Sequence, residues 1–256
     1  MIGIARGGSG CLCGPQEAVR FGLCTVSTKF STYSGQCTHV DAMRNATKTT
    51  LRRSTYHHGD LRRVLLDAGV ALARRAGPEA VVLREVTRQA GVVPNAAYRH
   101  FSNRDDLLAA VRAEALSQLA VVMQTELAKV RKGMPAAELA RANLRAVGVG
   151  YLRFAQSEPG LFHTAFSTPE RVEGDVNSAT AGRNGLNPFQ LLGAALDQLV
   201  QSGALPPNRR VGAEYLAWSA VHGLALLVAD GPLHGAPRRQ REAIGRRLLE
   251  MVEKGL

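Results

Sequence analysis

Three consecutive residues of this 256-residue chain carry side chains that suit nucleic-acid phosphates: Tyr98, Arg99 and His100. A phenol hydroxyl, a guanidinium and an imidazole can each donate a hydrogen bond to a phosphate oxygen, which positions a protein on DNA without reading its sequence. Arg84 and Arg104 flank the triplet and are further phosphate candidates. We therefore expect this segment to lie against a polyanion.

The residues just before the triplet can read bases. Pro94, Asn95 and Ala96 open the same segment. An Asn amide can form two hydrogen bonds with adenine, and an Ala methyl group can contact the methyl group of thymine. These three residues are therefore predicted to meet base edges in the major groove.

Two short helices joined by a tight turn would hold these side chains in place. The sequence predicts one helix over residues 83–90 and another over residues 94–101, with Gly91 between them. A glycine can adopt the backbone angles that such a turn requires. The pattern predicts a helix-turn-helix whose second helix fits the major groove. Two short helices within an ordinary helical core are the alternative.

The rest of the chain from residue 56 onward consists of apolar segments with helical spacing, separated by Gly and Pro. Helices are predicted over residues 60–76, 102–132, 136–157, 187–203, 208–230 and 237–253, with a short apolar segment over residues 161–166. Residues 168–185 are polar and rich in Gly and Asn, which predicts a loop. No alternating apolar pattern indicates a sheet. The expected fold is all-α: a three-helix head containing the helix-turn-helix, followed by an α-helical bundle.

Composition favours a polyanionic partner and excludes several classes of protein. The chain has 32 Lys and Arg against 21 Asp and Glu, a formal charge of +11, which favours nucleic acid or a membrane surface as a partner.

No run of 18 uncharged apolar residues occurs, so no membrane span is expected. The four cysteines lie in the first 37 residues and lack the spacing of zinc ligands. No nucleophile–base pattern or Gly-rich phosphate loop occurs, so we predict no catalytic site, metal or cofactor.

Residues 1–55 differ from the rest of the chain. They contain seven basic and two acidic residues, many Gly, Ser and Thr, and no helical apolar period. Such a segment buries too little apolar area to offset the entropy of ordering, which predicts a disordered basic extension. The alternative is that translation begins at Met43. His57 and His58 follow the extension and are candidates for contacts with the DNA backbone, with a merely solvated tail as the alternative.

Aromatic residues gather on both sides of a Pro-Gly break at residues 159–160 and recur in a late helix. They predict a pocket for a mainly apolar small molecule. The candidate pocket residues are Tyr151, Phe154, Phe162, Phe166, Trp218 and His222. Ordinary core packing is the alternative for each of them.

Two late helices are candidates for a dimer interface. The helix predicted over residues 208–230 is apolar nearly all round, so it must be buried on more than one side. Pairing it with the helix over residues 187–203 across a two-fold axis would form a four-helix interface. The predicted interface residues are Phe189, Leu192, Leu196, Val200, Val211, Tyr215 and Trp218. A monomeric core is the alternative.

Several of these segments resemble the TetR (tetracycline-repressor-like) family of transcriptional regulators. The resemblance to the DNA-binding domain of that family rests on Tyr56-His-His-Gly-Asp-Leu61, Tyr98-Arg-His-Phe101 and Arg104-Asp-Asp-Leu-Leu108. Ala217-Trp-Ser-Ala-Val-His-Gly223 and Asp230-Gly-Pro-Leu233 look like the C-terminal domain of one subgroup, in which a Trp and a His-Gly pair recur.

The resemblance implies a function. Proteins of this family are cytoplasmic homodimers that bind double-stranded DNA, usually repress transcription from a palindromic operator and respond to a small-molecule effector. For this chain the resemblance implies phosphate contacts by Tyr98, His100 and Arg104, and base contacts by Asn95 and Ala96. The effector is not identified by the sequence. An architectural DNA-binding protein of the same fold, without an effector, is the alternative.

The resemblance also implies a division into domains. The DNA-binding domain covers residues 56–103, and the effector-binding and dimerisation domain covers residues 104–256. Two positions depart from the family pattern, because Val82 and Val93 stand where Ser or Thr often caps the two helices of the motif. Each missing cap costs about 1 kcal/mol.

Overall fold

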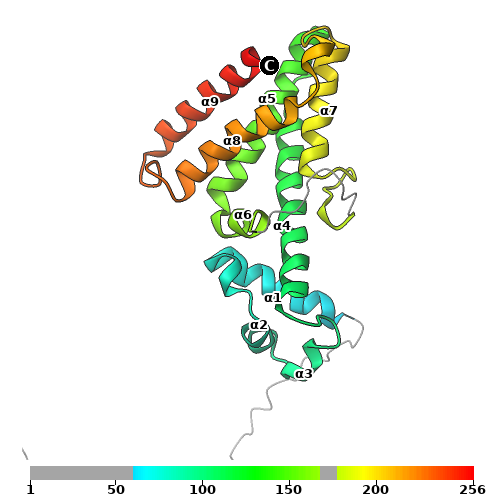
Figure 1. Cartoon of the computed structure of the whole chain (residues 1–256), viewed down its shortest axis with the longest axis vertical. Helices are drawn as coiled ribbons and strands as arrows, with labels where there is room; N and C mark the ends of the chain where they lie inside the picture. Colours follow the sequence, from blue (N-terminus) through cyan, green and yellow to red (C-terminus); the bar gives the residue numbers. More distant parts are fainter. Residues whose placement is uncertain (1–59, 168–177) are drawn as a thin grey trace, which may run out of the picture. The chain divides into compact units, whose positions relative to one another are not determined.

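Residues 60–167 and 178–256, the parts of the chain that the structure describes, are built from helices without strands (Figure 1). In this computed structural model the α-helices are α1 (Leu61–Ala76), α2 (Leu83–Ala90), α3 (Pro94–Ala97), α4 (Arg104–Leu127), α5 (Ala136–Ser157), α6 (Pro159–Ala165), α7 (Pro188–Gln201), α8 (Ala213–Ala229) and α9 (Arg238–Gly255). Short 3-10 helices lie at Pro78–Ala80, Ser178–Thr180 and Pro207–Arg209. The predicted all-α fold is confirmed.

None of these helices is both long enough and apolar enough to cross a membrane. The predictions made for residues 1–59, and those for residues 168–177 of the predicted loop, lie outside the described residues.

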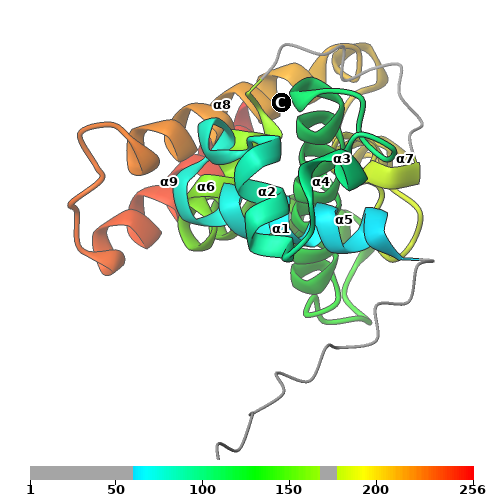
Figure 2. The same ribbon diagram turned by 90° about the horizontal axis from the view of Figure 1, so that it is seen from below.

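Helix α1 packs on the beginning of α4, and α2 and α3 pack on α1 and on each other to complete the head (Figures 1 and 2). Its core contains side chains with no exposed surface from each of these helices: Leu65, Val86, Ala97, Phe101, Leu107 and Val111. The crossing of α1 and α4 is close, because a Cβ atom at Gly69 would lie 2.8 Å from a methyl carbon of Val111. A larger residue at that point would push the two helices apart.

The turn between α2 and α3 has the geometry that the sequence predicts. Gly91 has a left-handed backbone (φ 68°), and the next amide, that of Val92, donates to the Thr87 carbonyl at 3.0 Å. Val82 and Val93 occupy the N-cap positions of α2 and α3, and neither side chain makes a capping hydrogen bond. Both helices of the motif therefore begin without the side-chain hydrogen bond that a Ser or Thr at these positions would provide.

The second helix of the motif is shorter than predicted. It ends at Ala97, and the amides of His100 and Phe101 both donate to the Ala97 carbonyl at 2.9 Å. Tyr98, Arg99 and His100 therefore lie in a turn rather than in the helix. Phe101, which is fully buried, holds this turn against the head.

The remaining helices form the body around the rest of α4. Helices α5, α6 and α7 pack against α4, and α8 and α9 lie side by side on α5 (Figures 1 and 2). A Cβ atom at Gly150 would lie 2.5 Å from the Cα atom of Met123, so α5 and α4 touch backbone to backbone. A single helix, α4, therefore belongs to both the head and the body.

Helix ends in the body follow local capping signals. Asn187 accepts a hydrogen bond from the Gln190 amide at 2.9 Å while the Gln190 side chain accepts one from the Asn187 amide at 2.9 Å, a capping box with Pro188 in the first turn. Helix α4 begins after Asn103, which accepts from the Asp106 amide at 2.8 Å. Helix α8 begins at Ala213, later than the predicted residue 208, because a 3-10 helix and a left-handed Gly212 (φ 78°) precede it.

Replacing the N-cap of α7 tests the capping box. We expect Asn187→Ala to lower the free energy of unfolding by about 1 kcal/mol, because the Gln190 amide at the helix start loses its acceptor. Asn208→Ala, at an exposed position of a 3-10 helix, is the control and should change stability by less than about 0.5 kcal/mol. Urea denaturation followed by circular dichroism measures both. Equal effects of the two substitutions would contradict the assigned role.

Candidate DNA-binding surface and ligand cavity

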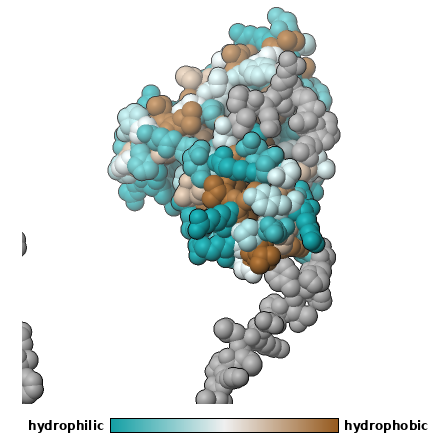
Figure 3. Space-filling model, turned by 60° about the horizontal axis from the view of Figure 1, so that its bottom comes forward, coloured by the Kyte–Doolittle hydropathy of each residue, from teal (hydrophilic) through white to brown (hydrophobic). Residues whose placement is uncertain are grey.

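One surface of the head presents the side chains that the sequence predicts to contact DNA. Arg84, Pro94, Asn95 and Arg99 are exposed, and Tyr98 exposes 56% of its surface. Ala96 and His100 are half-buried, so they lie at the surface as well. Figure 3, in which the bottom of the molecule comes forward, shows hydrophilic surface interrupted by hydrophobic patches.

Buried neighbours fix the orientation of this surface. Ala97 and Phe101 point into the core of the head, which leaves the residues between them at the surface. Thr87 is buried in α2 and its hydroxyl donates to the Arg84 carbonyl at 2.9 Å. The Arg62 guanidinium lies 5.0 Å from the centre of the Phe101 ring, a cation–π contact that covers the ring.

Arg104 has an internal structural role. Its Nε donates to the Val81 carbonyl and its Nη2 to the Pro78 carbonyl, both at 3.0 Å. The same Nη2 lies 3.3 Å from the Glu79 carboxylate. These bonds fasten the start of α4 to the segment that precedes α2. His57 and His58, the other candidates on the chain before α1, lie outside the described residues.

The body contains a partly open cavity of about 670 Å³. Residues of α4 to α9 line it, chiefly apolar ones such as Leu116, Met123, Leu192 and Trp218. A volume of this size is typical of sites for drug-sized molecules. The cavity is therefore the candidate ligand site.

A chain of hydrogen bonds lies in the wall of the cavity. The Trp218 indole Nε1 donates to the Tyr151 hydroxyl at 3.1 Å, and that hydroxyl lies 2.7 Å from Nδ1 of His222. Burial raises the pKa of the Tyr151 hydroxyl and lowers the pKa of the His222 imidazole. Both groups are therefore uncharged at neutral pH.

Two family models match this chain. The model described as "Bacterial regulatory proteins, tetR family" matches residues 65–111, which include the helix-turn-helix. The model described as "Tetracyclin repressor-like, C-terminal domain" matches residues 144–252, which form most of the body. The chain belongs to the TetR family. It therefore has the DNA-binding helix-turn-helix and the helical C-terminal domain of a TetR-family transcription regulator.

Solved structures with the same fold include members of this family. A protein of unknown function from Rhodococcus sp. RHA1 is 25% identical, with a TM-score of 0.62 over 79% of this chain and 98% of that one. The transcriptional regulator FadR from Bacillus subtilis, solved in complex with stearoyl-CoA, is 16% identical, with a TM-score of 0.54 over 76% of this chain and 98% of that one. A TetR family transcription regulator from Marinobacter aquaeolei VT8 is 20% identical, with a TM-score of 0.50 over 74% and 93%. No curated protein matches the sequence.

Four of the six predicted pocket residues of this TetR-family chain line the cavity: Tyr151, Phe166, Trp218 and His222. Phe154 and Phe162 do not; they are 1% and 0% exposed and belong to the core. Phe162 supports the wall from behind, since its ring centre lies 5.1 Å from that of Phe166 and 5.5 Å from that of His222.

One residue of the predicted dimer interface needs correction. Leu196 is fully buried within the protomer, so it cannot contact a second copy. Phe189, Leu192 and Trp218 line the cavity, and Val200 is half-buried. Helical spacing showed that α8 is apolar on several faces but could not show which face points outward.

The exposed face of α8 is offset from the predicted one. Val211 exposes 92% of its surface, Leu216 63% and Leu227 46%, while Tyr215 and Leu226 are also exposed. Val211 and Tyr215 were predicted from the sequence; the three leucines were not assigned to the interface. These five residues, of which Val211 lies just before α8, are called the α8 face below.

Parts of the cavity wall come from helices that the sequence did not connect with a ligand. Arg112, Leu116 and Met123 of α4, and Leu249 and Val252 of α9, line it together with the aromatic residues. They carry no local signal, because only the packing of distant helices brings them to one place.

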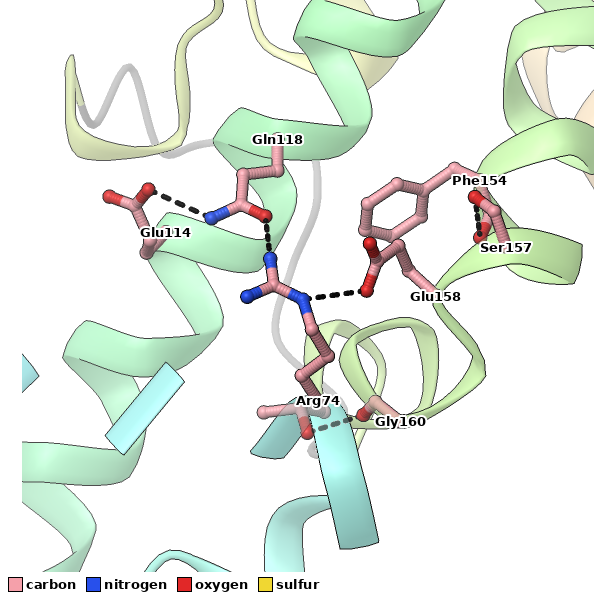
Figure 4. A network of polar contacts seen from close by, with 8 residues as sticks. Arg74, Glu114, Gln118, Phe154, Ser157, Glu158 and Gly160 are labelled. Carbon is pink, nitrogen blue, oxygen red and sulfur yellow. Dashed lines mark hydrogen bonds and ion pairs between the residues drawn. The ribbon is translucent and has the colours of Figure 1, made fainter. Parts of the chain in front are cut away.

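The body also touches the head through α6 (Figure 4). Nε of Arg74, near the end of α1, donates to Glu158 at 2.8 Å, and its Nη2 donates to Gln118 of α4 at 2.9 Å. A Cβ atom at Gly160 would lie 2.3 Å from the Ala73 carbonyl oxygen, so α6 meets the end of α1 without space for a side chain. The aromatic residues of α6 are thus linked directly to the head.

Adding one methyl group at this contact tests how tight it is. We expect Gly160→Ala to lower the free energy of unfolding by about 1–3 kcal/mol, because α6 must move away from α1. Gly193→Ala in α7 is the matched control: its nearest neighbours would be 3.7 Å away, so the higher helix propensity of Ala should stabilise the protein. Urea denaturation compares the two variants. A stabilised Gly160→Ala variant would show that the two helices do not meet closely.

Proposed function

We propose that this TetR-family chain is a ligand-responsive repressor that binds a palindromic operator as a homodimer. One observation carries the proposal: α4 is a single helix whose beginning lies in the core of the DNA-binding head and whose later turns line the ligand cavity. Acting on DNA, the protein would work in the cytoplasm.

On the DNA, two sets of side chains would have different roles. Asn95 and Ala96, with Pro94, would meet base edges at the start of α3. The turn after α3, with Tyr98, Arg99 and His100, would contact phosphates, as would Arg84 at the start of α2. For Arg104 the remaining Nη1 group would serve such a contact, since its Nε and Nη2 hold carbonyls of the head. His57 and His58 would add backbone contacts from the preceding segment.

The α8 face supports the homodimer. Large apolar side chains exposed in one row along a helix are unfavourable in water, and a two-fold axis would pair each row with its copy. Together with the partly exposed side of α7, the pair of rows would form a four-helix interface. Two heads held in this way would read half-sites about 34–36 Å apart.

We expect two arrangements of the dimer, one with the heads farther apart and one with the heads closer together. The ligand would act by binding these two arrangements with different affinity. Arg112 borders the cavity while its neighbour Val111 is fully buried against α1. A molecule that shifts α4 therefore shifts the head, because packed cores move as units. The contact of α6 with α1 offers a second connection, since α6 carries the wall residue Phe166 at its end.

An architectural DNA-binding protein without an effector is the second candidate. The cavity favours a ligand-responsive protein, because an architectural role gives no reason for an apolar space of this volume in the body. The complex of Bacillus subtilis FadR with stearoyl-CoA supports the same view, since it shows that a protein of this fold can bind a ligand.

The base-reading and phosphate-contacting roles give different results in one assay. After selection of bound DNA from a random pool at fixed salt, we expect Asn95→Ala to relax preference at one base pair by about 1–3 kcal/mol. Tyr98→Phe and His100→Ala should weaken binding to all selected sequences alike. Gln240→Ala, exposed on α9, is the control. Fluorescence anisotropy of labelled duplexes measures the affinities.

If Asn95→Ala weakened binding to all sequences equally, Asn95 would not be a base reader. A pool in which no sequence is enriched would refute operator binding.

The homodimer is tested on the α8 face. We expect Leu227→Glu to weaken dimerisation at least tenfold, because two carboxylates would be buried near the two-fold axis. Met251→Glu is the matched control, since Met251 is also an exposed apolar residue (60%) but lies on α9. Sedimentation velocity over a range of concentrations compares the variants. A dimer that survives Leu227→Glu but not Met251→Glu would place the interface elsewhere.

A further inference from the structure

The hydrogen-bond chain in the cavity wall has a fixed direction. An indole Nε1–H can only donate, so Trp218 uses one lone pair of the Tyr151 oxygen. The Tyr151 side chain is buried, and among the described residues the group beside its hydroxyl that can accept its proton is Nδ1 of His222, at 2.7 Å. His222 is therefore the tautomer with its proton on Nε2.

The second ring nitrogen of His222 is available to a ligand. The ring borders the cavity and is only half-buried. Among the described residues its Nε2 has no hydrogen-bond partner. Protonation of Nδ1 would remove the acceptor of the Tyr151 proton, and burial also lowers the pKa of His222. The cavity wall thus presents a neutral N–H donor.

The charged groups at the cavity have interactions of their own. Arg145 donates to Glu253 at 2.7 Å, and Glu253 also lies 3.6 Å from Arg141. Arg112, which is 6% exposed, has an interaction of its own as well, while its Nε atom is buried and makes no hydrogen bond to the described residues. The other lining residues are mainly aromatic or aliphatic, so the wall as a whole favours uncharged molecules.

We propose that the effector is an uncharged, mainly apolar molecule whose carbonyl oxygen accepts a hydrogen bond from Nε2–H of His222. The apolar part of the molecule lies among Phe166, Trp218 and Phe189, which line the same cavity. Tyr151 is a positioning residue, because it holds the His222 ring and its tautomer. This proposal rests on the proposed function, since it specifies the ligand of the same cavity.

Matched probes test the carbonyl contact. The first is 4-phenylbutan-2-one, and the second is isopentylbenzene, in which a methyl group replaces the carbonyl oxygen. The ammonium ion of 4-phenylbutan-2-amine and 4-phenylbutanoate are the charged counterparts. Trp218 is the only tryptophan in the sequence and lines the cavity, so its fluorescence, excited at 295 nm, reports binding of each probe to the full chain.

The decisive quantity is the ratio of the ketone and hydrocarbon affinities, compared between variants, because the different hydrophobicity of the probes then cancels. We expect His222→Phe to lower the ketone-to-hydrocarbon ratio about tenfold, since the donor is lost. Tyr151→Phe should lower it severalfold. Leu192→Ala is the control: Leu192 lines the cavity through an aliphatic side chain, so both affinities should fall and the ratio should stay unchanged.

The outcomes separate this proposal from the proposed function. An unchanged ratio in His222→Phe, or tighter binding of the ammonium ion or the carboxylate than of the ketone, would overturn the carbonyl proposal and leave a ligand-responsive regulator standing. If none of the four probes changed the Trp218 fluorescence, the cavity would not be a ligand site of this kind, and the ligand-responsive function would fail with it.

A measurement on the unmodified protein does not depend on the folding of variants. In the protein labelled with ¹⁵N-histidine, we expect His222 to show a proton on Nε2 and an unprotonated Nδ1. Adding 4-phenylbutan-2-one should shift the Nε2–H proton signal downfield, whereas isopentylbenzene should not. A proton on Nδ1 of His222, or no response to the ketone, would contradict the proposal.

Discussion

The structure depends on the shared helix α4, which contributes to two hydrophobic cores at once. Its first turns carry Leu107 and Val111 into the head, and later ones bring Met123 against the backbone of α5. Because tightly packed interiors resist deformation, neither end can shift alone. The body therefore determines the orientation of the head through the direction of one helix, and the Arg74 contacts with Glu158 and Gln118 restrain the same junction at the surface.

Local chemistry explains which parts of the fold the sequence predicts. A left-handed Gly91 and the Asn187–Pro188 pair each set a helix end through atoms a few residues apart, so the pattern alone indicates them. The end of α3 does not follow from such a signal. The two amides that share the Ala97 carbonyl form a turn whose residues have ordinary helical propensity, and burial of Phe101 decides where it lies.

The ligand cavity and the outward face of α8 were likewise only partly predictable from the sequence. The aromatic residues near the Pro159–Gly160 break predict much of the cavity, because they are neighbours in sequence and Phe166 and Tyr151 remain neighbours in space. The contributions of α4 and α9 could not be predicted, since they depend on contacts between distant helices. The outward face of α8 was predicted only in part, through Tyr215 and the adjacent Val211, because a helix that is apolar nearly all round does not indicate which side meets water. The buried position of Leu196 in α7 emerged only from the packing.

Three helix crossings, at Gly69, Gly150 and Gly160, leave no space for a side chain. The walls of the cavity, in contrast, consist of side chains that can be exchanged for others of similar volume at modest cost. The frame that transmits movement thus meets backbone to backbone at Gly150 and Gly160, while the part that recognises the ligand is made of replaceable groups. Such a division lets new chemical selectivity evolve by substitutions in the walls without redesign of the machinery that moves the heads.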